Sequence, residues 1–185
     1  MKDFYEAFIN LSHKVLGKRL KPFSLTHCLY LEAIDSPFMK VINGDEAQIT
    51  RKDLELAVMI CLSAEPLKEI SRAYSLKNIP MKFHSFKRGC TQFLSYLTDF
   101  VTLPELWDKT EGNHALNAPW ILSKATLLLT KTNMSLSEIW NLPLGELLWY
   151  SACIAEHSGV AEIQSESDKA AIEEALKVQK NEHSK

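Results

Sequence analysis

The side chains best suited to metal binding or nucleophilic catalysis in this 185-residue chain are its cysteines and histidines. Thiolates and imidazoles hold zinc at short characteristic spacings, and the same groups act as nucleophile and base in many hydrolases. Here no two cysteines form a CxxC pair, and the histidines show no metal-ligand spacing among themselves. The candidate side chains are Cys28, Cys61, Cys90, Cys153, His13, His27, His84, His114, His157 and His183.

Cys28 is the best-placed candidate nucleophile, because it lies one turn into a predicted helix and a helix N-terminus lowers the pKa of a thiol. All four cysteines lie in apolar stretches, and small buried thiols are the alternative interpretation. The chain also lacks GxxxxGK(S/T), GxSxG, HExxH and a GxGxxG between strand and helix. We therefore predict no catalytic residue, no metal ion and no cofactor, although an enzyme whose site is assembled from distant residues stays open.

Basic residues between 67 and 88 suggest a second kind of chemistry, the binding of phosphates. The segment LKEISRAYSLKNIPMKFHSFKRG resembles a helix-turn-helix, and its cations would face DNA. A solvated helix face explains the same pattern, and 21 basic against 23 acidic residues argue against a dedicated nucleic-acid-binding protein. The candidate contacts in this alternative are Lys77, Lys82, Lys87 and Arg88.

Tryptophans lie only in the second half of the chain, at positions 107, 120, 140 and 149. Two of them flank a Pro-containing element, EIWNLPLGELLWY. Tryptophan is enriched both in protein cores and in the centres of binding interfaces, so core packing is the alternative here. We predict that this element grips a protein partner through Trp140, Pro143, Leu144, Trp149 and Tyr150.

These side chains would be positioned by short helices. Apolar residues at three- and four-residue steps, with caps at Asp3, Ser24, Thr50 and Ser135, predict an all-α protein, an irregular bundle of about seven to eight short helices. The predicted ranges are 3–16, 24–35, 50–62, 65–74, 81–101, 119–130, 135–141 and 144–158.

The sequences of the connections between these helices indicate their structure less clearly. Residues 39–49, with Asn43-Gly44-Asp45, read as a loop that also allows a minor hairpin near 41–49. Residues 102–117 read as a long connection holding at most one helical turn around Leu106-Trp107. We divide the chain into a helical domain over 1–159 and a charged C-terminal helix or flexible tail over 160–185.

Composition and hydropathy indicate the cell compartment in which the protein acts. Hydrophobic residues make up 46% of the chain, enough for a sizeable core, and the formal net charge is −2. No apolar run approaches the roughly 18 residues that span a bilayer, and the first residues lack a signal-peptide core. We predict a cytoplasmic protein with no membrane partner and an undetermined oligomeric state.

Two segments resemble a known family. The segment MSLSEIWNLPLGELLWYSACIAEHSG is similar to the C-terminal element of tail assembly chaperones from tailed phages and prophages, in the order Ser135, Ile139, Pro143 and Trp149-Tyr150. The earlier LGKRLKPFSLTHCLYLEAIDSPF looks like the N-terminal half of small phage tail-module proteins. Together these segments cover about a quarter of the chain.

The resemblance implies a helical protein that is not an enzyme and needs no cofactor. Such chaperones coat the long apolar tape measure protein before the tail tube polymerises around it, and they recruit tube subunits. The partner expected from the resemblance is therefore the tape measure or tail tube protein, met in the host cell cytoplasm. Physically, the task asks for apolar surface that accepts amphipathic helices.

Overall fold

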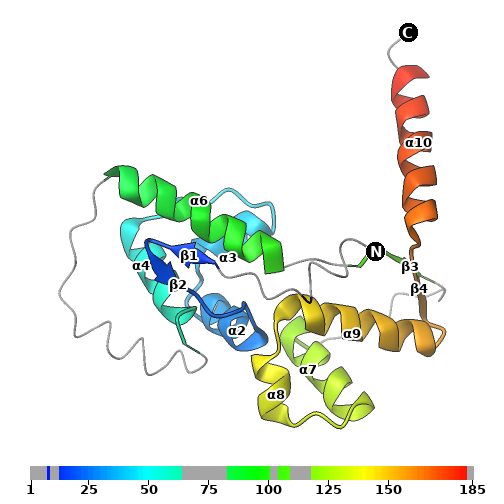
Figure 1. The fold of residues 1–185 in the computed structure, drawn as a ribbon, viewed down its shortest axis with the longest axis horizontal. Helices are drawn as coiled ribbons and strands as arrows, with labels where there is room; N and C mark the ends of the chain where they lie inside the picture. Colours follow the sequence, from blue (N-terminus) through cyan, green and yellow to red (C-terminus); the bar gives the residue numbers. More distant parts are fainter. Residues whose placement is uncertain (1–7, 9–12, 64–82, 101–103, 109–117, 183–185) are drawn as a thin grey trace.

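The computed structural model describes residues 8, 13–63, 83–100, 104–108 and 118–182. Within them the chain forms eight helices and two small antiparallel sheets, so the protein is mostly helical but not purely α (Figure 1). The helices are α2 (Leu25–Ala33), α3 (Pro37–Ile42), α4 (Arg51–Ile60), α6 (Phe83–Phe100), α7 (Trp120–Lys131), α8 (Leu136–Asn141), α9 (Leu144–His157) and α10 (Glu166–Glu182). The strands are β1 (Lys14–Val15), β2 (Lys18–Arg19), β3 (Leu106–Asp108) and β4 (Ala161–Ile163).

Helix starts follow the predicted caps. The Thr50 N–H donates to Asp53 Oδ2 at 2.8 Å, and the Asp53 N–H donates back to Thr50 Oγ1 at 3.3 Å. This reciprocal capping box satisfies two N–H groups that the first turn of α4 leaves without helical partners. Ser24 and Ser135 begin α2 and α8 in the same way. The predicted cap at Asp3 and the predicted helix over 65–74 lie outside the described residues.

The predicted end of the first helix is wrong. Residues 14–19 form a hairpin in which Lys14 pairs with Arg19 and Val15 with Lys18. Its two turn residues have positive φ, +52° at Leu16 and +78° at Gly17, as a type I′ turn requires. Gly17 adopts this conformation without steric cost, so it closes a hairpin here and does not end a helix.

The minor hairpin near 41–49 is also wrong. Val41 and Ile42 belong to α3, which begins at Pro37 and is followed by a loop. Proline suits the first turn of a helix because its fixed φ is already helical and it lacks an N–H that would go unpaired. The Ser36-Pro37 step therefore starts a new helix directly after it ends the previous one.

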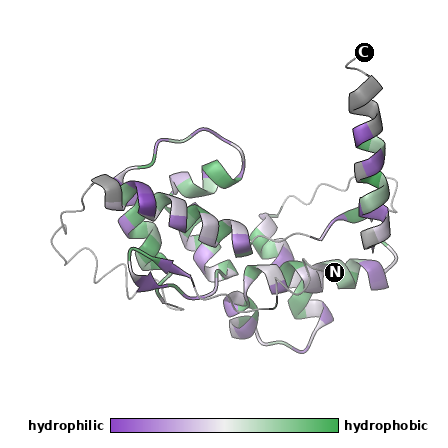
Figure 2. Cartoon of the chain, turned by 45° about the horizontal axis from the view of Figure 1, so that its top comes forward, coloured by the Kyte–Doolittle hydropathy of each residue, from purple (hydrophilic) through white to green (hydrophobic). Residues whose placement is uncertain are grey.

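The predicted helical turn around Leu106-Trp107 is replaced by strand β3. This strand pairs antiparallel with β4, with Leu106 opposite Ile163 and Asp108 opposite Ala161. The chain beyond residue 159 thus contains a strand that packs on the body and then α10, which extends away from it (Figure 1). Hydrophilic residues recur along α10 (Figure 2).

Aromatic side chains of α6 form the centre of the core. Phe93 and Tyr96 are fully buried, and the Phe93 ring meets Phe38 of α3 edge to face, with centroids 4.7 Å apart. The Tyr96 hydroxyl donates a hydrogen bond to the Lys21 carbonyl at 2.8 Å. This bond anchors α6 to the segment that leads into α2.

Gly89 lets α6 approach its neighbours closely. A Cβ built at this position would lie 2.8 Å from Cδ2 of Leu16 and from Cδ2 of Leu54. Both distances are shorter than carbon–carbon contact. The absence of a side chain therefore brings α6 onto the β1–β2 turn and onto α4.

Helices α7, α8 and α9 pack together and join the rest of the body through α2 (Figure 1). The buried side chains of both halves form one continuous hydrophobic cluster. Within the described part of the chain, no helix is both long enough and apolar enough to cross a lipid bilayer.

Candidate partner-binding surface

The element predicted to bind a partner is built from α8, a two-residue extended link and α9. Ser135 caps α8: its N–H donates to Glu138 Oε2 at 2.7 Å, and its hydroxyl does so at 2.6 Å. These hydrogen bonds lower the pKa of the exposed Glu138 carboxyl. Leu142 and Pro143 are extended, and Pro143 is followed at once by α9. The proline thus sets the bend between the two helices.

Three contacts fasten this element to the start of α2. The Leu144 N–H donates to the Phe23 carbonyl at 2.7 Å, and Pro143 forms an isolated β-bridge with Ser24. The Thr26 hydroxyl donates to the Trp140 carbonyl at 2.8 Å. The Pro-containing turn is therefore held by the backbone of Phe23 and Ser24 and by the Thr26 hydroxyl, which lies 114 residues before Trp140 in the chain.

The five predicted binding residues lie on this element but differ in burial. Leu144 is 3% exposed and belongs to the core, so its side chain does not face solvent. Trp140, Pro143, Trp149 and Tyr150 are half-buried. The Tyr150 ring packs edge-on against Phe8, with centroids 5.7 Å apart. Each of these four side chains therefore has an accessible part, and much of each packs inside the protein.

Apolar side chains that are more accessible than these four lie on α7. From the sequence this segment was predicted to be a helix, but not to be part of a binding surface. Leu122 is 51% exposed and Leu129 is 46% exposed. They are seven residues apart, with the exposed Thr126 between them, so all three lie on one helix face. An adjoining face of the helix holds the buried Ile121 and Leu128. We call Leu122, Thr126 and Leu129 the outer stripe of α7.

A second apolar patch connects α7 to α2. The indole N–H of Trp120 donates to Glu32 Oε1 at 3.0 Å, and Trp120 is 42% exposed. Leu29, also 42% exposed, lies one turn before Glu32 on the same side of α2. We call Leu29, Glu32 and Trp120 the Trp120 corner. Trp120 was noticed in the sequence as one of four tryptophans, but its exposure depends on packing that the sequence does not reveal.

The cysteines are poorly suited to nucleophilic chemistry. Cys28 is buried, and burial together with the nearby Glu32 carboxylate raises the pKa of its thiol to about 12. Burial also raises the pKa of Cys61, which is fully enclosed. A thiol that stays protonated is a weak nucleophile. Among the described residues, no three His, Cys, Asp or Glu side chains gather as metal ligands would.

The cations of the nucleic-acid alternative are only partly described. Lys87 and Arg88 are exposed on α6. Lys77 and Lys82 lie outside the described residues.

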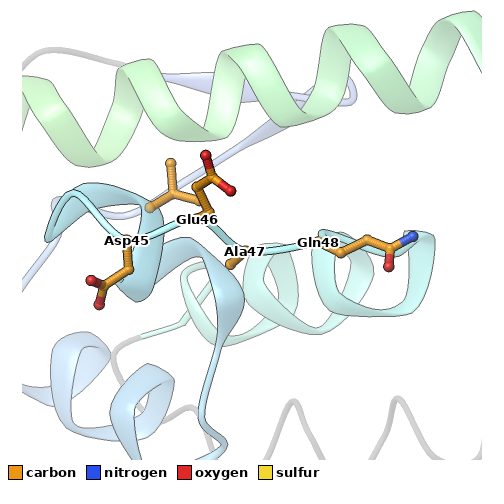
Figure 3. A pocket seen from close by; sticks show the side chains of 5 residues that line it. Asp45, Glu46, Ala47 and Gln48 are labelled. Carbon is orange, nitrogen blue, oxygen red and sulfur yellow. The ribbon is translucent and has the colours of Figure 1, made fainter.

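A hollow of about 670 Å³ opens beside the loop after α3 (Figure 3). Val41, Asp45, Glu46, Ala47 and Gln48 line it, and the Asp45 and Glu46 carboxylates are exposed. It is wide open, and the apolar Val41 and Ala47 line it together with two carboxylates and an amide. A hollow this open, with two exposed carboxylates at its edge, is a poor match for the apolar groove that a helical partner would require.

Comparison with known proteins adds no assignment. No protein family, curated protein or solved structure matches this chain.

Proposed function

We propose that the protein is a phage or prophage tail assembly chaperone that binds a helical segment of the tape measure protein, or tail tube subunits, without catalysing a reaction. The observation that carries the proposal is the exposed apolar surface of α7, next to the α8–α9 element that resembles these chaperones. Leucines spaced seven residues apart on one face match the anchors that one amphipathic helix offers another.

The half-buried rings of the α8–α9 element extend this surface in the proposal. Large aromatic side chains with one accessible edge supply contact area at low entropic cost and are common at the centres of interfaces. Trp140, Trp149 and Tyr150 would contribute such edges, whereas Pro143 and the buried Leu144 would hold the bend. On this proposal the chaperone acts in the host cell cytoplasm, where the tail is assembled.

Co-expression with the tape measure protein tests the proposal. The double variant Leu122→Ser, Leu129→Ser should retain at least tenfold less tape measure protein in a pull-down, equivalent to about 1.4 kcal/mol of binding free energy. The matched control is Leu176→Ser on α10, which removes a leucine that is 52% exposed and should leave binding unchanged.

Two results would overturn the proposal. One is a tape measure protein whose solubility and pull-down do not respond to the wild-type chain. The other is a genomic neighbourhood without genes for a tail tube protein and a tape measure protein. Circular dichroism of the double variant should match the wild type, because exposed serines cost the fold little.

A second candidate function, DNA binding, is favoured by the exposure of Lys87 and Arg88 on one helix. Its test is a mobility shift with random duplex DNA at low salt, where phosphate contacts are strongest. A shift that disappears in Lys87→Glu, Arg88→Glu would support this function. No shift, or a shift that these substitutions leave unchanged, would remove it.

A further inference from the structure

His27 occupies a junction of three segments, and its hydrogen bonds define its protonation state. The residue is 2% exposed. Its Nδ1 lies 3.1 Å from the Ser24 backbone nitrogen and 3.1 Å from Ser24 Oγ, and its Nε2 lies 2.7 Å from the Ser63 carbonyl oxygen. A backbone N–H can only donate and a carbonyl can only accept. Nδ1 is therefore the acceptor, and Nε2 carries the proton of a neutral ring.

This ring takes the place that glutamate or glutamine usually holds in a capping box. It lies at the third helical position of α2, accepts the N–H of the cap residue Ser24, and reaches across to the chain after α4. The Phe23 ring stacks on it, with centroids 6.2 Å apart and planes 16° apart. One imidazole thus joins the N-terminus of α2 to the chain that follows α4.

The same short segment also holds α9. Ser24 forms the β-bridge with Pro143, and the carbonyl of the adjacent Phe23 accepts the Leu144 N–H at 2.7 Å. The backbone on both sides of the α2 cap is therefore shared between His27 and the start of α9. A change in the protonation of His27 would therefore reach the contact with Pro143 and Leu144 through Ser24 and Phe23 alone.

Protonation is incompatible with the cap. A proton on Nδ1 would point at the Ser24 N–H, so that two donors would face each other and the charged ring would lose this hydrogen bond. Burial also opposes the charge and lowers the pKa of His27, although the carbonyls of Ser63 and Pro22 favour the charged ring and reduce the shift.

The surrounding groups supply no counter-charge in contact with the ring among the described residues. Cys61 and Tyr96, which neighbour the junction, stay neutral because burial raises the pKa of both. Further titratable groups on the surrounding segments include Cys28 and Glu32 on α2, His13 beside Tyr96 with its Nε2 3.5 Å from Asp99 Oδ2, and Glu146 in the first turn of α9.

We propose that His27 is a pH-sensitive latch whose neutral ring closes the junction of α2, α4 and α9, and whose protonation releases the Ser24 segment from the start of α9. The pH dependence of the latch follows from the lowered pKa of His27, because the folded state then favours the neutral ring. The latch is fully closed above the ordinary histidine pKa of about 6.5 and weakens as the pH falls from there to the pKa of the folded state. Below the pKa of the folded state, His27 is protonated whether the latch is open or closed, and a further fall in pH weakens the latch no more.

Nuclear magnetic resonance of the full chain tests the latch. The imidazole signals of His27 should titrate below the ordinary histidine pKa of about 6.5. The protection factor of the Leu144 amide against hydrogen exchange should fall by up to about tenfold per pH unit in the same range. A Leu144 protection factor that stays constant while His27 titrates would overturn the proposal.

Two variants separate His27 from the other groups. His27→Asn keeps a hydrogen-bond acceptor near the Ser24 N–H but cannot be protonated, so the pH dependence of Leu144 protection should flatten. His157→Asn, at the end of α9, should keep the wild-type slope. A His27→Asn protein that retains the wild-type slope contradicts the latch. If that variant does not fold, the wild-type titration alone supports or overturns the proposal.

Discussion

At the scale of single residues, buried polar side chains hold together segments that are distant in the sequence. Tyr96 on α6 bonds the carbonyl of Lys21, and its hydroxyl also interacts with the Cys61 thiol. Thr26 on α2 bonds the carbonyl of Trp140. Each bond gives a carbonyl in a part-buried position a hydrogen-bond partner within the protein. None of these pairings was predicted, because a tyrosine or a threonine carries no signal in the sequence that names its distant partner.

Removal of one of these bonds has a measurable cost. Tyr96→Phe should lower the free energy of unfolding by about 0.5–1.5 kcal/mol, since it removes a part-buried hydrogen bond to the Lys21 carbonyl while the ring still fills its space. Urea denaturation followed by circular dichroism measures the change. Tyr30→Phe, on a half-buried tyrosine of α2, is the control and should change stability less. Equal stability of Tyr96→Phe and the wild type would contradict the importance of this bond.

At the scale of elements, the sequence was most informative where a local rule determines the structure. Caps at Ser24, Thr50 and Ser135 lie within a few residues of the helices that they begin, and these starts were predicted. The strand over 106–108 was missed because its partner lies over 161–163, and two three-residue strands carry almost no periodic signal.

Which apolar side chains of a helix are exposed also could not be predicted from the sequence alone. The sequence ILSKATLLLT predicts a helix, but leucines lie on more than one of its sides, so periodicity alone does not say which of them are buried. The structure buries Leu128 and exposes Leu122 and Leu129. The aromatic element from Trp140 to Tyr150 was identified as a candidate, whereas the outer stripe of α7 required the packing of α7 on α8 and α9.

The capping carboxylates predict a pH dependence at this scale. The Ser135 hydrogen bonds lower the pKa of Glu138, and Ser165 does the same for Asp168 at the start of α10. A carboxyl whose folded-state pKa is lowered stabilises the helix above its ordinary pKa, and the effect is lost as the pH falls through the lowered value. Both helix starts should therefore fray in acid.

Substitution by the neutral amide tests this expectation. Glu138→Gln should weaken α8 at neutral pH and remove the part of its acid dependence that the carboxyl causes. Asp168→Asn should do the same for α10 and leave α8 unchanged. Amide chemical shifts of the two first turns, followed from pH 7 to pH 3, measure both effects. An acid transition of α8 that is identical in Glu138→Gln and the wild type would refute the assignment.

At the scale of the whole molecule, stability is distributed unevenly. Helix α6 contributes several of the largest buried side chains, whereas α10 extends from the body and its described residues are mostly exposed (Figure 1). Near its start, Lys169 lies 3.8 Å from Glu105 in an ion pair that is partly exposed. Exposed ion pairs of this kind contribute about 0–1 kcal/mol.

Hydrogen exchange measured by mass spectrometry should separate the two helices. Peptides from α10 should exchange with little protection, because few buried contacts oppose their local opening. Peptides from the middle of α6 should exchange only through global unfolding. The β3–β4 pairing should give residues 161–163 intermediate protection. Strong protection throughout α10 would show that this helix packs on something in solution.

The junction of α2 with the start of α9 also has a consequence for the order of folding. Thr26 and Trp140 are 114 residues apart, so their bond closes a very long loop, and the entropy of closure is lost before the contact returns any free energy. During synthesis on a ribosome, the N-terminus of α2 must wait until α8 and the start of α9 have emerged. We expect this docking to be a late step. Thr26→Val should accordingly accelerate unfolding and leave the folding rate almost unchanged, a φ-value near zero in stopped-flow kinetics.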